Sequence, residues 1–314
     1  MQKYFTFSIR LKPTMDKAII KVSKELRLDQ LKLDNAVVII DDSGEPYAGK
    51  ISAKNQYKIE KPDIKALEEI HKEIHSRGSP SIIAIGGLSA INTAKILSLP
   101  RLPHKNLRET VYENKPPDLR PLIIATVPAM CTEATKLTLF FDPVNPVWLM
   151  RHTVPPIFLT TPAFLENALQ DPKTQVVNHD VSLIKKAPDH NLFSYLSLCG
   201  LYEKFGPGPL TILLLTIASL YSLNIEEVAK NLAKLNIQEA YTRIKIKDDP
   251  QSWIEEEAKF REKRPKLYKK MDLLVEHSWT FYSLQLRRYG FKGKTDLYKF
   301  YRSLLISLSI LGKP

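Results

Sequence analysis

Short apolar runs alternate with segments of helical period between residues 35 and 128, and this alternation restricts the fold more than any other feature. The runs are AVVII (36–40), SIIAI (81–85) and PLIIA (121–125). Each run is unbroken, as in a strand that is covered on both faces. Residues 64–74 carry Ile and Leu at helical spacing, and residues 89–99, ended by Pro100, read as a second helix. The alternation predicts an α/β layer with parallel strands and right-handed crossovers.

The second half of the chain changes character. LTLFFDP (137–143) and PPIFLTTP (155–162) predict further strands, but from about residue 181 onward the apolar residues recur only at helical spacing. A chain of 314 residues is long enough for two packed domains. We therefore predict an N-terminal, parallel-sheet, nucleotide-binding-like α/β domain over residues 1–175 and an all-helical domain over residues 176–314.

Composition narrows the function classes only in part. The formal net charge of +12 suits nucleic acid, an anionic membrane surface or a phosphorylated ligand, and it disfavours a strongly cationic substrate. Apolar runs of 18 or more residues are absent, so we expect no membrane span. The first residues lack the apolar core of a signal peptide, and we expect a cytoplasmic protein. Abundant Lys, Ile and Leu with only 11 glycines would suit a thermophile.

Two cysteines are too few for a disulfide scaffold, and they lack metal-ligand spacing. We expect both thiols to be reduced. Cys199 sits in an apolar helical segment and is expected in the core. Cys131 lies in a loop, where it could be an exposed thiol near a cleft, although nothing in the sequence marks its pKa as lowered.

The stretch IIAIGGLSAINTAK (82–95) is the strongest candidate for a binding site. A strand that ends in two glycines and turns into a helix presents main-chain amides at the positive end of the helix dipole, where a phosphate can approach. We call the main-chain amides at the start of this helix, from Gly87 to Ala90, the anion seat. The alternative is that the two glycines only make a tight turn. Lys95 could likewise reach a phosphate or be an ordinary solvated lysine.

Three segments resemble motifs of the iron-containing alcohol dehydrogenase superfamily, which includes glycerol dehydrogenase and dehydroquinate synthase. GGLSAINTAK (86–95) resembles the signature GGGSxxDxAK, with Leu88 and Asn92 replacing the third glycine and the aspartate. ATVPAMCTEATKLTLF (125–140) resembles a loop with the pattern IPTTxGTGSExT, shortened by three residues that include its Gly-Thr-Gly core. PPIFLTTPAFLENAL (155–169) is similar to PxxVIxDPxLxxxLP.

The resemblance implies a dehydroquinate synthase-like fold and a cofactor, NAD or NADP. It also implies a small anionic ligand, since several members of the family act on phosphorylated polyols or ketones. Carried over position by position, it implies cofactor contacts by Gly86, Gly87, Ser89, Asn92, Lys95, Thr132 and Thr135.

The resemblance also implies a metal site in the helical domain, but this sequence departs from it. VNHDVSLIKKA (177–187) places Asp180 at the position of the first metal ligand, yet the histidine that should follow is absent. His277 is the candidate for a late ligand. Asp180 could instead be a helix-start residue, and His277 a partly exposed histidine on a basic helix. With three rigid ligands required, the residues favour no catalytic divalent metal. No catalytic residue can be assigned.

The helical half carries most of the positive charge. Residues 243–302 contain 16 Lys or Arg against 9 Asp or Glu, interleaved with aromatic residues. This pattern suits contacts to nucleic acid. It suits equally a solvated helix face whose aromatic residues turn to the core.

Two functional hypotheses follow. The first is an NAD(P)-dependent dehydrogenase-like protein that acts on a small polyol or ketone, phosphorylated forms included, with an incomplete metal site. The alternative is a catalytically inactive pseudoenzyme of the same fold that binds a nucleotide, nucleic acid or a protein. The sequence leaves the oligomeric state open.

Overall fold

The computed structural model describes residues 17–26, 28, 36–50, 53, 55–78, 80–113, 119–185, 193–245 and 250–305. The chain divides into two compact units. The first unit comprises residues 1–175 and 188–206, and the second comprises residues 176–187 and 207–314. The chain leaves the first unit after residue 175, and residues 188–206 return to it.

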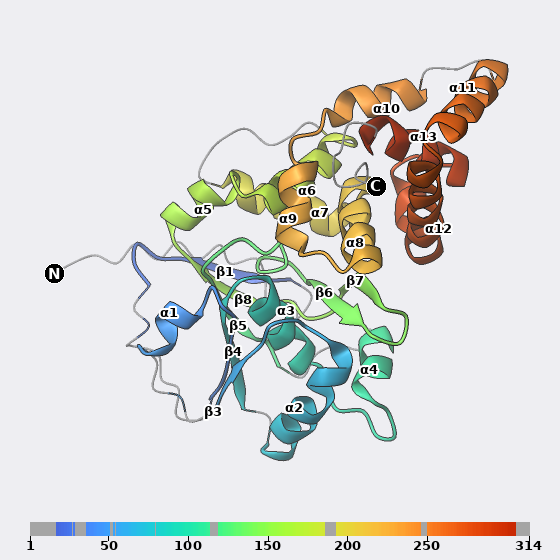
Figure 1. Ribbon diagram of the computed structural model, residues 1–314. Helices are drawn as coiled ribbons and strands as arrows, with labels where there is room; N and C mark the ends of the chain where they lie inside the picture. Colours follow the sequence, from blue (N-terminus) through green and yellow to red (C-terminus); the bar gives the residue numbers. More distant parts are fainter. Residues whose placement is uncertain are drawn as a thin grey trace. The chain divides into compact units, whose positions relative to one another are not determined.

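The first unit is built on a parallel six-stranded sheet with the order β1-β8-β5-β4-β2-β3 (Figure 1). Its strands are β1 (Ile19–Val22), β2 (Ala36–Ile40), β3 (Asn55–Lys58), β4 (Ser81–Gly86), β5 (Leu122–Ala125) and β8 (Ile157–Thr160). An antiparallel hairpin of β6 (Leu137–Asp142) and β7 (Val147–His152) is separate from the sheet. The predicted α/β layer with parallel pairing is confirmed.

The helices of this unit connect and cover the strands. They are α1 (Glu45–Ala48), α2 (Ile64–Ser76), α3 (Leu88–Leu97), α4 (Leu107–Glu113), α5 (Pro162–Ala168) and α7 (Ser194–Phe205). Asp63 starts α2 because its carboxylate accepts hydrogen bonds from the amides of Lys65 and Ala66. Helix α7 packs on α5, which explains why residues 188–206 belong to the first unit.

The central strands are apolar because both of their faces are covered. All five residues of β2 are buried, as are the last five residues of β4. Side chains of one face of β2, β4 and β5 form a single cluster with Leu28. The apolar runs of the sequence were therefore correctly predicted as central strands.

The two edge strands were not predicted. β1 and β3 lie at opposite edges of the sheet, and β3 alternates half-buried and exposed residues. An edge strand is half solvated and carries polar residues, so neither IIKV nor NQYK forms a continuous apolar run.

The described part of the second unit is helical, as predicted. Its elements are the end of α6 (Pro172–Ser182), α8 (Pro209–Tyr221), α9 (Ile225–Leu232), α10 (Ile237–Lys245), α11 (Pro250–Lys263), α12 (Pro265–Arg288) and α13 (Lys294–Leu305). Every residue of α8 from Pro209 to Ala218 is buried, so this helix is the centre of the unit. None of the described helices is long and apolar enough to cross a membrane.

Candidate functional site: the turn after β4 and the strand-end cleft

The turn between β4 and α3 has the geometry that the sequence predicts, but two of its main-chain amides are occupied. β4 ends at Gly86, whose φ of +150° favours glycine, and Gly87 precedes the first residue of α3. The amides of Gly87 and Ala90 donate hydrogen bonds to Oδ2 of Asp41, at 2.9 and 3.1 Å. The expectation of free amides in the anion seat is wrong, because a side chain of the protein caps them.

The capping carboxylate is saturated with hydrogen bonds. Its other oxygen, Oδ1, accepts from the Ser43 amide at 3.1 Å, the Ser43 hydroxyl at 2.7 Å and the Gly44 amide at 3.2 Å. Asp41 directly follows β2, which lies beside β4 in the sheet, and it is only 8% exposed. One carboxylate therefore ties together the loops that follow two adjacent strands, where a phosphate would otherwise bind.

Close backbone packing leaves little space around this carboxylate. A Cβ atom added to Gly44 would lie 1.9 Å from the carbonyl oxygen of Ile85. A Cβ atom on Gly86 would lie 2.3 Å from Oδ1 of Asp41, and one on Gly87 would lie 2.6 Å from Cγ2 of Val127. These glycines are needed so that the two loops can approach each other, whether or not a ligand binds.

Lys95 does not reach the surface. Its ammonium donates hydrogen bonds to the carbonyls of Thr132 and Thr135, at 2.9 and 2.8 Å, and to that of Leu137. The side chain is fully buried. Burial lowers its pKa to about 7, and the Glu203 and Glu133 carboxylates partly offset that shift. Lys95 thus holds the loop that follows β5 in place through hydrogen bonds from the protein interior.

The other cofactor candidates lie in the same framework. Asn92 donates to the Leu88 carbonyl at 2.7 Å and accepts from the Leu139 amide at 2.7 Å, and it is fully buried. Thr132 and Thr135 are also fully buried. Their hydroxyls donate to main-chain carbonyls within the loop. The structure brings these residues together as packing and hydrogen-bonding partners, and their contact to a cofactor stays a prediction.

Ser89 is the remaining cofactor candidate of the Gly-Gly motif. It is half-buried, and its hydroxyl donates to the Glu60 carbonyl at 2.7 Å. Its side chain therefore ties the start of α3 to the segment after β3. Its contact to a cofactor also stays a prediction.

The loop after β5 also encloses a buried cluster that the sequence did not reveal. Glu133 Oε1 accepts from the Ala129 amide at 3.1 Å and from the hydroxyl of Tyr195. Burial raises the pKa of Glu133 and of the neighbouring Cys131 and Cys199 thiols. Cys131 is fully buried, so its expected exposure near a cleft is wrong, whereas Cys199 lies in the core as expected.

Asp180 caps a helix in the second unit. It lies in α6, and its two carboxylate oxygens accept from the amides of Leu210 and Thr211, at 2.8 and 2.9 Å. It is fully buried, and burial raises its pKa to about 7 although these hydrogen bonds oppose the shift. The carboxylate that the resemblance assigned to a metal is engaged at the N-terminus of α8.

His277 offers no metal site with Asp180. Its ring lies 4.9 Å from the Phe281 ring, and burial lowers its pKa. His179 lies beside the Ala233 carbonyl, with its Nε2 at 3.4 Å. Among the described residues, no group of three or more His, Cys, Asp or Glu side chains lies close enough together to hold a metal ion. The donors among the residues that the structure describes do not fit the catalytic metal of the resembled family, which requires at least three ligands.

The role of Asp180 as a buried cap predicts a specific pH dependence. The pKa of Asp180 is raised from 3.8 to about 7. Its contribution to the free energy of unfolding is therefore fully present below pH 3.8 and is lost as pH rises through 7. A shift of this size corresponds to about 4 kcal/mol. We expect Asp180→Asn to remove this decline in the free energy of unfolding, measured by urea denaturation across that range. Asp272→Asn, exposed on α12, is the control, and equal pH profiles for all three proteins would contradict the assignment.

A cleft of about 1050 Å³ opens at the carboxyl ends of the strands, within the first unit. Its apolar wall includes Leu26, Leu28, Ile85, Ile124 and Ala125. Ligand sites of open α/β sheets lie at this edge. We name it the strand-end cleft.

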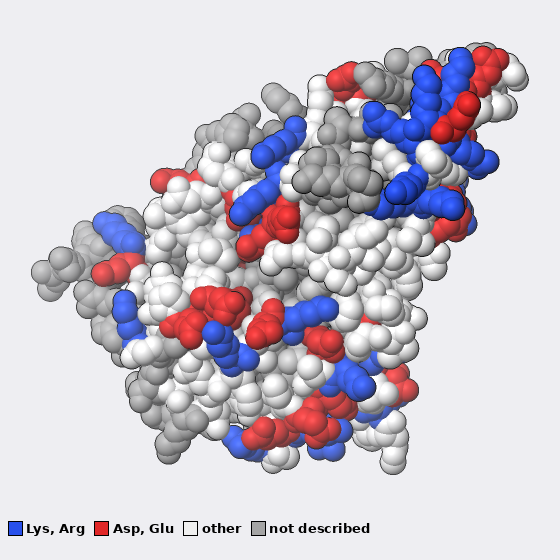
Figure 2. Space-filling view, viewed as in Figure 1, with Lys and Arg blue, Asp and Glu red and all other residues white. Residues whose placement is uncertain are grey.

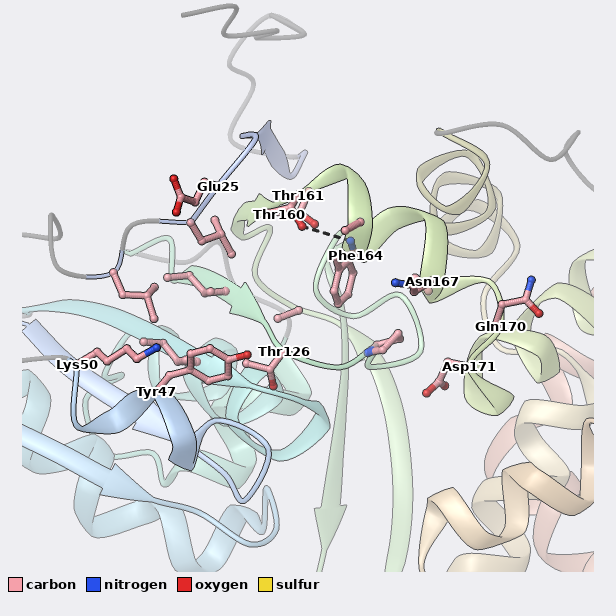
Figure 3. A pocket seen from close by; sticks show the side chains of 18 residues that line it. Glu25, Tyr47, Lys50, Thr126, Thr160, Thr161, Phe164, Asn167, Gln170 and Asp171 are labelled. Carbon is pink, nitrogen blue, oxygen red and sulfur yellow. Dashed lines mark hydrogen bonds between the residues drawn. The ribbon is translucent and has the colours of Figure 1, made fainter.

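Aromatic and polar side chains complete the strand-end cleft (Figure 3). Tyr47 enters it from α1, and Phe164 enters it from α5. The Thr160 hydroxyl is buried and has no hydrogen-bond partner among the described residues. Asn167 adds a carboxamide, and Lys50 adds an exposed ammonium 5.7 Å from the Tyr47 ring centre. The sequence pointed to the Gly-Gly turn and missed this cleft, because its lining comes from residues scattered between 25 and 171.

The fold places the chain in a known structural class. No family model and no curated protein matches the sequence. The solved structures of iron-containing alcohol dehydrogenases and glycerol dehydrogenases, however, share its fold along most of their length. The resemblance drawn from the motifs is confirmed at the level of the fold.

Three of these structures illustrate the similarity. An iron-containing alcohol dehydrogenase from Thermotoga maritima has a TM-score of 0.57 at 13% identity, covering 88% of this chain and 92% of that chain. A sulfoacetaldehyde reductase from Bifidobacterium kashiwanohense, solved in complex with NAD⁺, has a TM-score of 0.56 at 13% identity, with coverages of 93% and 98%. A probable glycerol dehydrogenase from Sinorhizobium meliloti 1021 has a TM-score of 0.55 at 12% identity, with coverages of 86% and 92%.

Proposed function

We propose that this chain is a small-molecule-binding member of the iron-containing alcohol dehydrogenase fold, in which the strand-end cleft takes a neutral, nucleoside-like ligand. The metal-assisted hydride transfer of that family is not its function. The observation that carries the proposal is the Asp41 carboxylate, which accepts hydrogen bonds from the Gly87 and Ala90 amides.

Electrostatic repulsion disfavours a phosphate in the anion seat. A phosphate that took the anion seat would need the amides that Asp41 already holds, and its charge would lie within a few ångströms of the carboxylate. Two like charges at about 4 Å repel by about 4 kcal/mol under the partial screening of a protein surface. A ligand without phosphate groups avoids this cost.

The helical unit supports the same proposal. Metal-assisted chemistry requires a carboxylate that is free to coordinate, and Asp180 instead accepts two main-chain hydrogen bonds at the start of α8. A Cβ atom on Gly208 would lie 2.5 Å from Cγ of Asp180, so the backbone closes over this carboxylate.

The strand-end cleft supports the class of ligand. Tyr47 and Phe164 offer ring surfaces to a planar heterocycle, and the buried Thr160 hydroxyl is ready to pair with a polar group of a ligand. The charged residues that line the cleft are Glu25, Lys50 and Asp171, and Asp171 pairs with Lys173 at 3.3 Å. Carboxylates and ammonium groups are therefore balanced at the cleft, which favours a neutral ligand over an anionic one.

The test compares adenosine, AMP and NADH by isothermal titration calorimetry. We expect adenosine to bind at least about tenfold more tightly than AMP or NADH, a difference of about 1.4 kcal/mol. Tyr47→Ala should weaken adenosine binding by about tenfold, because Tyr47 is 39% exposed and supplies ring contact without belonging to the core. Val144→Ala, 67% exposed on the β6–β7 turn, is the matched control.

The second candidate function is an NAD(P)-dependent dehydrogenase, favoured by the NAD⁺ complex of the structurally similar sulfoacetaldehyde reductase. It would replace the proposal if NADH or NADPH bound more tightly than adenosine and if added divalent metal then supported oxidation of a polyol.

A further inference from the structure

Positive charge is concentrated where α11 meets α12. The residues from 259 to 270 include a single carboxylate, that of Glu262. We call their cationic side chains the basic corner, which consists of Lys259, Arg261, Lys263, Arg264, Lys266, Lys269 and Lys270. Figure 2 shows Lys and Arg gathered over this part of the molecule.

The local structure explains the corner. α11 ends at Lys263, Arg264 leaves the helical conformation with φ −138° and ψ 60°, and Pro265 starts α12. Helical periodicity continues through this point in the sequence, but proline lacks an amide hydrogen and fits the first turn of a new helix. The break brings the end of one basic helix next to the start of another.

The exposed side chains of the basic corner are mainly cationic. Its large apolar residues, Phe260 and Leu267, are 8% and 5% exposed, so they belong to the core, whereas Pro265 is exposed at the break. The exposed Ile254 and Leu273 lie outside the corner, on α11 and α12. A helix that binds a membrane surface needs large exposed apolar residues among its cations. The corner supplies none of this size, which favours nucleic-acid phosphates over a lipid surface.

The corner also lacks a free stacking platform. Of its two aromatic residues, Phe260 is buried. The other is Tyr268, whose ring is covered by the Arg261 guanidinium at 4.4 Å and whose hydroxyl donates to Glu257 at 3.0 Å. Proteins that bind single strands stack bases on exposed rings. Exposed cations without such rings suit the phosphate backbone of a duplex.

We propose that the basic corner binds the phosphate backbone of double-stranded nucleic acid, independently of base sequence. The exposed Lys259, Lys263, Lys266 and Lys269 supply the contacts. This inference does not depend on the ligand of the strand-end cleft.

The test is fluorescence anisotropy with a labelled duplex of about 24 base pairs, across salt from about 50 to about 200 mM. We expect the triple variant Lys263→Glu, Lys266→Glu, Lys269→Glu to bind at least about tenfold more weakly at the lowest salt. The slope of log K against log salt should fall by about 0.9 for each phosphate that the protein no longer neutralises, hence by about 2 to 3. The milder variant Lys263→Gln, Lys266→Gln should show an intermediate weakening.

The matched control is Lys230→Glu, Lys234→Glu, which reverses two exposed lysines of the second unit outside the corner and should leave duplex binding unchanged. Circular dichroism checks that every variant is folded. The proposal is overturned if the triple variant binds the duplex like the wild type. Tighter binding to oligothymidylate than to the duplex would also overturn it, as would binding only to vesicles that contain phosphatidylserine.

Discussion

Asp41→Ala is expected to lower the free energy of unfolding by about 3 to 5 kcal/mol, measured by urea denaturation. The carboxylate accepts five hydrogen bonds, and four of them come from main-chain amides. Loss of a helix cap costs about 1 kcal/mol, and each buried amide left without a partner adds about 1 to 3 kcal/mol, although the amides do not contribute additively.

The same substitution should create a binding site. With the carboxylate gone, the Gly87 and Ala90 amides face the space it occupied at the positive end of α3. We expect inorganic pyrophosphate to stabilise Asp41→Ala by about 2.7 kcal/mol at a hundredfold excess over its dissociation constant, and to leave the wild type unchanged.

Asp42→Ala is the matched control for both measurements. Asp42 is the neighbouring residue, but its side chain is 83% exposed and it pairs with Lys58 at 3.0 Å. An exposed ion pair contributes at most about 1 kcal/mol, so this variant should be close to the wild type and insensitive to pyrophosphate. If Asp41→Ala behaved like Asp42→Ala, the capping role would be refuted.

Lys95→Met is expected to lower the free energy of unfolding by a similar amount, about 3 to 5 kcal/mol. It removes the donor from three buried carbonyls, those of Thr132, Thr135 and Leu137, and methionine has no donor to replace it. The loop that carries Cys131 and Glu133 should loosen first, so faster amide exchange there, measured by hydrogen–deuterium exchange, would accompany the loss of stability.

Lys65→Met, at the exposed start of α2, is the control for the removal of a lysine charge. It should change the free energy of unfolding by less than about 0.5 kcal/mol. A loss below about 1 kcal/mol for Lys95→Met would mean that its three hydrogen bonds contribute little, and that Lys95 is free for the phosphate contact considered from the sequence.

The sequence predicted the fold well where residues carry a periodic signal. Unbroken apolar runs identified β2, β4 and β5, because a strand covered on both faces must be apolar along its whole length. The same reasoning missed β1 and β3, because an edge strand is solvated on one side. Periodicity alone also does not locate the break between α11 and α12 at Pro265, because the apolar spacing continues across it.

The candidate site was predictable only in part. The motif located the turn at Gly86 and Gly87, since those glycines are required by close backbone contacts. That Asp41 fills the anion seat could not be predicted, because the two partners are 46 positions apart and meet only when β2 and β4 pair. The capping role of Asp180 could not be predicted for the same reason, because the amides that it caps lie 30 and 31 positions away at the start of α8.

The most direct test of the account follows the Gly87 amide itself. Selective ¹⁵N-glycine labelling gives at most 11 resonances. Adding ¹³C-carbonyl glycine assigns the Gly87 amide directly, because Gly86 and Gly87 are the only two consecutive glycines in the sequence. Inorganic pyrophosphate should leave this resonance unmoved in the wild type and shift it saturably in Asp41→Ala. A saturable shift in the wild type would contradict the central claim, because it would show that the amide is open to phosphate while Asp41 is present.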